Sequence, residues 1–240
     1  MISKRNALRF YFVNLVKYNW PLFQLYRKFS YNKSIGMRLV KKDSQIVIEG
    51  FPRSANSYLN RVFKATNPEV RRAHHIHSPF QFRIGYKLGI PLVLIIRKPK
   101  EVVQSMQVAY KGINPNEILK KYILFHRMLY PIRKKILIVS FEEVINDSSL
   151  VLKRINERFR TSYNTDGSKL SKDHIQLELK RHAVEKTKNE LMAGVPTNRK
   201  DNLKALIQSF EKEILDKELL AEAQIAYVDF INDIGIDRNA

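Results

Sequence analysis

Two short stretches place arginine, hydroxyl and amide side chains directly after an apolar run. The first is GFPRSANS, residues 50–57, which follows the run QIVIE at 45–49. The second is RKPKEVVQS, residues 97–105, which follows PLVLII at 91–96. A guanidinium is a planar fork of N–H donors that suits phosphate, and hydroxyl groups add further donors. Both stretches are therefore candidate anion-binding loops.

The elements around these loops alternate in type along the chain. Apolar, β-branched runs predict strands at 45–49, 91–96 and 136–140. Helical spacing predicts helices at 54–65, 99–110, 116–133 and 150–159, with a C-terminal helix at 203–231. This order predicts one α/β domain over residues 43–240, with a parallel sheet flanked by helices. Ligands of such sheets bind beyond the carboxyl ends of the strands, where both candidate loops are expected.

The first loop differs from the phosphate loop of nucleoside triphosphatases, G-x-x-x-x-G-K-[ST]. In the same frame Ala55 replaces the second glycine and Asn56 replaces the lysine, while Ser57 fits. The positive charge lies three positions earlier, at Arg53. A nucleotide-dependent phosphotransferase remains an alternative, but without that lysine phosphoryl transfer lacks its main positioning cation.

The stretch PRSANSY, residues 52–58, resembles the 5′-phosphosulfate loop P-[KR]-S-G-[TS]-[TS]-[WF] of sulfotransferases that use 3′-phosphoadenosine 5′-phosphosulfate (PAPS). The resemblance implies a three-layer, P-loop-like fold. It implies that Arg53 binds the phosphosulfate and takes part in catalysis. The other implied contacts to PAPS in this loop come from Ser54, Ala55, Asn56, Ser57 and Tyr58, the last beside the adenine. Ala55 stands where the family has glycine, which raises the question of which backbone angles the loop adopts.

The second loop resembles the 3′-phosphate motif of the same family, R-[ND]-P-x-[DE]-x-x-x-S. The matching positions are Arg97, Pro99, Glu101 and Ser105. This resemblance implies that Arg97 and Ser105 bind the 3′-phosphate. Phe141, at the end of the third strand, would lie against the adenine. Arg199 and Lys200 resemble a basic pair that closes over the 3′-phosphate, although a solvated basic loop explains them equally well.

Sulfuryl transfer to a hydroxyl group requires a base, and histidine is the usual one near neutral pH. The frame HIHSP, residues 75–79, resembles the K-T-H-x-P of the family, which makes His77 the candidate base. Alternatives are a structural histidine or a metal ligand together with His75, although two histidines make a poor zinc site. Glu49 and Glu101 are reserve candidates, because some family members use a carboxylate. No metal is needed for this chemistry.

The resulting prediction is an enzyme that transfers a sulfuryl group from PAPS to an acceptor hydroxyl group, or less favourably to an amine. Carbohydrate or glycolipid acceptors fit the basic surface. The main alternative from another class is a non-catalytic protein that binds nucleic acid or anionic membrane through its net charge of +20.

Residues 1–42 form a separate basic and aromatic arm without any Asp or Glu. Such a segment can lie on an anionic bilayer, or it can form helices that pack their aromatic rings on the domain. No specific nucleic-acid partner is expected. The sequence shows neither a signal peptide nor a long apolar run. We therefore expect a cytoplasmic protein, and peripheral membrane contact through the arm stays open beside packing of the arm on the domain.

Overall fold

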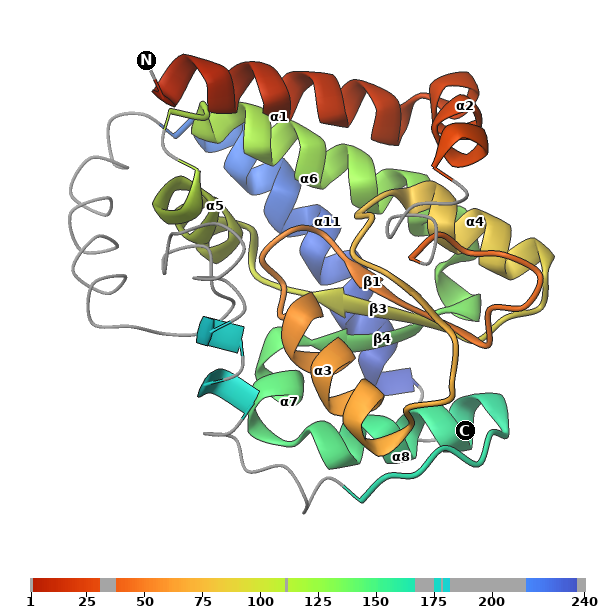
Figure 1. The fold of residues 1–240 in the computed structure, drawn as a ribbon. Coiled ribbons are helices and arrows are strands. Elements are labelled where there is room, and N and C mark those ends of the chain that lie inside the picture. Colours follow the sequence, from red (N-terminus) through yellow and green to blue (C-terminus); the bar gives the residue numbers. More distant parts are fainter. Residues whose placement is uncertain are drawn as a thin grey trace.

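The computed structural model describes residues 2–30, 38–110, 112–166, 175–177, 179–181 and 215–236. At the centre of these residues lies a sheet of four parallel strands in the order β2-β1-β3-β4 (Figure 1). The strands are β1 (Ile46–Gly50), β2 (Arg72–His74), β3 (Leu92–Ile96) and β4 (Leu137–Ser140). Because all four run the same way, their carboxyl ends, and the loops that follow them, share one edge of the sheet.

Both faces of the sheet are buried, and alternate residues of each strand serve the two faces. In β1, Val47 packs into one apolar cluster, whereas Ile46 and Ile48 pack into the other. β3 and β4 alternate in the same way, with Leu94 and Ile138 on the first face. This two-sided burial explains why the sequence shows continuous apolar runs at these positions.

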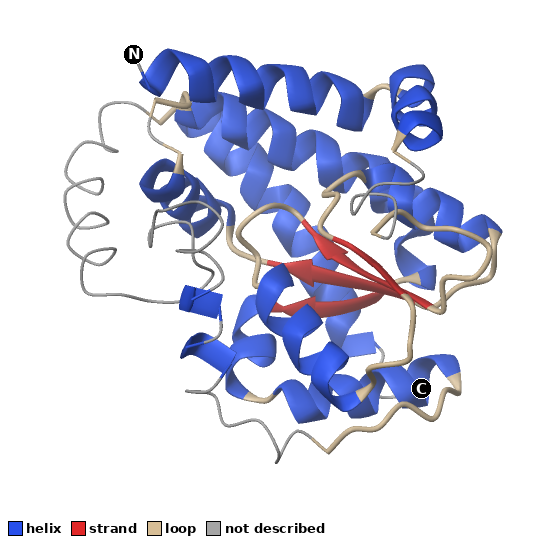
Figure 2. Cartoon of the chain, viewed as in Figure 1, coloured by secondary structure: helices blue, strands red, loops and turns tan. Residues whose placement is uncertain are grey.

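Helices cover both faces and make three layers (Figure 2). The first cluster includes side chains of α1 (Ile2–Tyr18), α2 (Trp20–Phe29), α4 (Pro79–Lys87), α5 (Pro99–Ala109), α6 (Pro115–Leu129) and α11 (Lys217–Ile236). The second includes side chains of α3 (Asn56–Thr66), α7 (Phe141–Asn146) and α8 (Ser148–Phe159). The predicted fold class, a parallel sheet flanked by helices, is confirmed.

Local signals explain where several helices begin. Pro79, Pro99 and Pro115 each lie in the first turn of a helix, where the missing N–H costs nothing and the fixed φ angle suits the helix. Ser140 and Glu143 form a reciprocal capping box at the start of α7. Of these signals, Pro99 lies within the second candidate loop.

The structure departs from the sequence-based elements at four places. The helix expected over 203–231 is interrupted at Leu215 and Asp216, and α11 runs from Lys217 to Ile236, while residues 203–214 lie outside the described residues. The helix expected over 116–133 ends as α6 at Leu129 and continues as a 3-10 helix, Tyr130–Lys135, because Pro131 cannot donate to the α-helical ladder. The three-residue edge strand β2 and the helix α4 were not predicted. β2 is too short to show an alternation, and α4 has several small or polar residues among its apolar ones.

The arm packs on the domain through only part of its surface. Phe23 of α2 is fully buried, and Phe10 and Tyr18 of α1 pack against the same cluster. Leu39 and Val40, near the end of the arm, are also core residues. Within the described residues, no helix has the length and apolar character needed to cross a bilayer. Where the arm ends and the domain begins stays a prediction.

Candidate active site

The loop after β1 is held by close backbone packing. A Cβ atom at Gly50 would lie 2.3 Å from the carbonyl oxygen of Ile95 on the neighbouring strand, so only glycine fits there. Asn56, at the start of α3, donates from Nδ2 to the Phe51 carbonyl at 3.0 Å. Its amide therefore bridges the loop, and it occupies the position where nucleoside triphosphatases have a lysine.

The backbone of this loop adopts left-handed angles at two non-glycine residues, Arg53 (φ 73°) and Ala55 (φ 66°). Alternating backbone hands of this kind turn successive N–H groups toward one concave side, which is an anion-binding arrangement. Ala55 is the N-cap of α3 and gives no side-chain cap to the helix. Ser54 is fully buried and its Oγ has no hydrogen-bond partner. The loop thus keeps hydrogen-bonding capacity that the protein itself does not use.

The structure brings the arginines of both motifs into one group, which we call the arginine cluster: Arg53, Arg97, Glu101, Ser105 and Phe141. Arg53 donates from Nε to Ser105 Oγ at 3.0 Å. Arg97 donates from Nη1 to the backbone carbonyl of Arg53 at 2.9 Å. Burial lowers the pKa of both guanidinium groups, and the charge of Arg97 adds to the lowering at Arg53. Arginine still remains a cation at neutral pH, so two positive charges share this edge of the sheet.

Several contacts hold Arg97 in place. Its Nε donates to Glu101 Oε2 at 3.1 Å, and its guanidinium carbon lies 3.9 Å from the centroid of the Phe141 ring. Its backbone carbonyl accepts a hydrogen bond from the Tyr122 hydroxyl at 2.8 Å. Glu101 is therefore engaged in an ion pair with Arg97, and its reserve role as a base stays a prediction.

His77 is held in one tautomer. Its Nδ1 lies 2.8 Å from the Gly50 carbonyl oxygen, which can only accept, so Nδ1 carries the proton and Nε2 presents a lone pair. Burial lowers the pKa of His77 well below its ordinary value, and the nearby Lys17 charge acts in the same direction. The ring is thus neutral at neutral pH, which is the form that a general base requires.

Glu49 supports the loop that carries His77. Its buried carboxylate accepts from the backbone N–H of Ile76 at 2.6 Å and from that of His77 at 3.2 Å. Burial raises the pKa of Glu49 to about 7, against the opposing effects of these hydrogen bonds and of Lys17. Its place beneath the loop makes Glu49 a positioning residue for His77.

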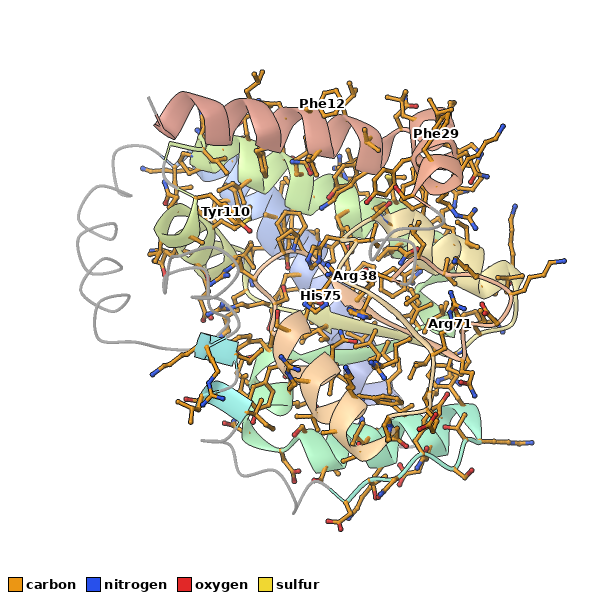
Figure 3. The ribbon with its side chains drawn as sticks, viewed as in Figure 1. Phe12, Phe29, Arg38, Arg71, His75 and Tyr110 are labelled. Carbon is orange, nitrogen blue, oxygen red and sulfur yellow. The ribbon has the colours of Figure 1, made fainter. Side chains whose placement is uncertain are left out.

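A chain of polar contacts that the sequence did not reveal runs beside His77. Ser57 Oγ lies 2.8 Å from His75 Nε2, and His75 Nδ1 lies 2.7 Å from His74 Nδ1. Together with His77 and Glu49, these residues form the histidine cluster. Ser57 belongs to the first predicted loop, so this contact joins the two parts of the site. His75 (labelled in Figure 3) and His77 both have positive φ, which keeps them out of a regular strand.

The remaining predicted residues lie elsewhere. Tyr58, in the first turn of α3, is buried in the second apolar cluster, where its ring serves packing. Arg199 and Lys200 lie outside the described residues. No group of three potential metal-ligating side chains occurs in the part of the chain that the structure describes.

Comparison with known proteins gave likeness to solved structures only. No protein-family model matches the sequence, and no curated protein matches it. Among solved structures, the chain is similar to mouse sulfotransferase SULT7A1 complexed with PAP, at 14% sequence identity and a TM-score of 0.47. The alignment covers 82% of this chain and 93% of the mouse protein chain. A likeness of this strength says nothing about activity, which must be judged from the site itself.

Proposed function

We propose that this protein is a sulfotransferase that takes the sulfuryl group of PAPS and transfers it to an acceptor hydroxyl group. One observation carries the proposal: the two motif arginines interlock, Arg97 through the carbonyl of Arg53 and Arg53 through the hydroxyl of Ser105. Two fixed cations and a hydroxyl, beside a helix start without a side-chain cap, suit a ligand that carries more than one phosphate group.

The residues present fit the two phosphate-bearing ends of the cofactor. The loop N–H groups, Ser54 and Arg53 would hold its 5′ end, and Arg97 with Ser105 would hold its 3′-phosphate. The unpartnered Ser54 Oγ supports this assignment, because a buried hydroxyl group without a partner is costly unless a ligand supplies one. PAPS supplies the activated sulfuryl group. Arg53 stabilises the negative charge that develops on the departing phosphate oxygen.

His77 takes the proton of the acceptor hydroxyl group at Nε2. The hydrogen bond from Nδ1 to Gly50 fixes the ring, and the Glu49 carboxylate fixes the backbone beside it. As the acceptor oxygen bonds to sulfur, the bond from sulfur to the phosphate oxygen breaks and the proton passes to His77.

The phosphotransferase alternative is weaker on structural grounds. Asn56 occupies the lysine position of the triphosphatase loop, and its amide donates to the Phe51 carbonyl. A neutral side chain that is already engaged with the backbone cannot replace a cation that positions a terminal phosphate.

The test is a thermal-shift and calorimetric comparison of 3′,5′-phosphoadenosine with adenosine 5′-phosphate, ATP, GTP and RNA. We expect a specific stabilisation by 3′,5′-phosphoadenosine, because a ligand that binds only the native state raises the unfolding temperature. Adenosine 5′-phosphate lacks the group assigned to Arg97 and Ser105, and should bind more weakly. Equal shifts with ATP and 3′,5′-phosphoadenosine would overturn the proposal.

A further inference from the structure

The outer face of α1 exposes a row of large apolar side chains. Leu8, Phe12 and Leu15 are 72%, 67% and 56% exposed. Their spacing of four and three residues places them on one side of the helix. The opposite side is anchored, since Asn14 is buried and Tyr18 packs against the core. The helix is therefore fixed in orientation, with its apolar row directed outward.

The following helix extends this surface. In α2, Phe29 is 70% exposed and Leu25 is 53% exposed. Trp20, at the start of α2, packs edge-to-face against the Phe80 ring but remains 41% exposed. Figure 3 shows Phe12 and Phe29 on the side of the molecule formed by α1 and α2. We call these six residues, Leu8, Phe12, Leu15, Trp20, Leu25 and Phe29, the arm surface.

The charge of the arm indicates what this surface contacts. Residues 1–42 contain ten Lys and Arg residues and no Asp or Glu. Exposed apolar and aromatic side chains within a purely basic segment are typical of helices that lie in the headgroup region of an anionic bilayer. The side chains project from two helices, and a soft lipid interface accepts such projections without a matching groove.

We propose that the arm surface docks this protein on membranes that contain anionic lipid. Leu8, Phe12 and Leu15 enter the boundary between headgroups and acyl chains, and the basic residues of the arm attract the lipid charge. The docking helix is also fastened to the candidate site, because Ser78 Oγ, next to His77, donates to the Lys17 carbonyl at 2.8 Å. The proposal does not depend on sulfuryl transfer.

The test measures binding of the full chain to vesicles of phosphatidylcholine, with and without phosphatidylserine. We expect strong partition only when phosphatidylserine is present, and weaker partition as salt is raised. The triple variant Leu8→Ser, Phe12→Ser, Leu15→Ser should lose at least about ten-fold in partition, because three apolar side chains no longer leave water. Binding to pure phosphatidylcholine as strong as to the mixed vesicles would overturn the proposal.

A matched control uses exposed apolar residues on other parts of the molecule: Leu150→Ser, Leu177→Ser and Ile225→Ser, at positions 49%, 55% and 63% exposed. This variant should bind vesicles as the unmodified chain does, and both variants should unfold at similar temperatures. Equal losses in the two triple variants would contradict docking by the arm surface. Displacement of the unmodified chain from vesicles by RNA at physiological salt would reassign the basic charge to nucleic acid.

The chain offers an internal reporter, because its one tryptophan lies in the arm surface. On addition of phosphatidylserine vesicles, Trp20 emission should shift to shorter wavelength, and it should become protected from aqueous quenchers. The triple α1 variant should show a reduced shift at the same lipid concentration. An unchanged spectrum in the presence of bound vesicles would show that another surface makes the contact.

Discussion

The arginine cluster and the histidine cluster lie on the two sides of the loop that follows β1, and they differ in electrostatic character. The arginine cluster contains two guanidinium groups that remain charged at any physiological pH. In the histidine cluster, burial keeps the rings of His74 and His77 neutral, with the pKa of His74 lowered to about 2 and that of His77 lowered well below its ordinary value.

This difference separates two tasks. A permanent cation binds phosphate without changing its protonation, whereas a neutral imidazole with a free lone pair can accept a proton. The loop after β1 connects phosphate binding with proton transfer, since Arg53 belongs to the arginine cluster and Ser57 to the histidine cluster. We therefore expect substitutions on one side to affect binding and substitutions on the other to affect turnover.

The largest effect is expected on the histidine side. Replacing His77 by Gln should lower kcat by roughly 100-fold or more, because general base catalysis contributes at least that much. The affinity for 3′,5′-phosphoadenosine, measured by calorimetry, should change less than about two-fold, since the hydrogen bonds and ion pairs of His77 are to Gly50 and Glu49 and not to the arginine cluster. A kcat equal to that of the unmodified enzyme would exclude His77 as the base.

Substitutions in the arginine cluster should instead weaken cofactor binding. Arg97→Ala should weaken 3′,5′-phosphoadenosine binding by about 10- to 100-fold, the range for losing a charged hydrogen-bond donor. Arg83→Ala, on the exposed side of α4, removes the same charge at a distance and serves as the matched control. If the two variants had equal affinities for 3′,5′-phosphoadenosine, net charge rather than the arginine cluster would account for binding.

Acid should destabilise the protein through its buried histidines. The pKa of His74 is lowered to about 2, that of His126 to about 4, and that of His77 is also lowered. Each histidine favours its neutral form in the folded state. Its contribution to the free energy of unfolding is therefore present above pH 6.5 and is lost as the pH falls. Glu49, with its pKa raised to about 7, opposes this loss because it binds its proton more tightly when folded.

We therefore expect the free energy of unfolding to fall by about 1 to 3 kcal/mol between pH 7 and pH 5. Urea denaturation at a series of pH values measures this. The variant Glu49→Gln keeps an acceptor for the backbone but removes the opposing titration, so its stability should fall more steeply with acid. A flat profile in both proteins would contradict neutral, buried histidines.

The smallest effect concerns the loop that joins the two clusters. Ala55 has a left-handed conformation that glycine adopts without strain, so Ala55→Gly should raise the free energy of unfolding by about 0.5 kcal/mol. Ala65→Gly, on the exposed part of α3, should instead lower it by about 0.5 to 1 kcal/mol. Destabilisation by both substitutions would show that the loop does not depend on that backbone angle.

The sequence by itself determined the layered arrangement of strands and helices. It also determined the edge of the sheet at which the candidate site lies. The apolar runs predicted β1, β3 and β4 because strands buried on both faces must be apolar throughout. Helical spacing predicted the helices at 99–110 and 116–133, and Pro99 lies at the start of the first because proline tolerates the first turn. Since parallel strands end at one edge, Arg53 and Arg97 could be expected there before any contact was known.

Only the tertiary structure decided which side chains meet. The contact of Ser57 with His75 depends on how the short edge strand β2 returns beside β1, and no local pattern encodes that return. The engagement of Glu101 with Arg97 and the burial of Tyr58 in the core also arise from packing. Spacing along a chain fixes which edge of a sheet a residue approaches, but distances between side chains depend on loops and neighbouring elements far apart in sequence.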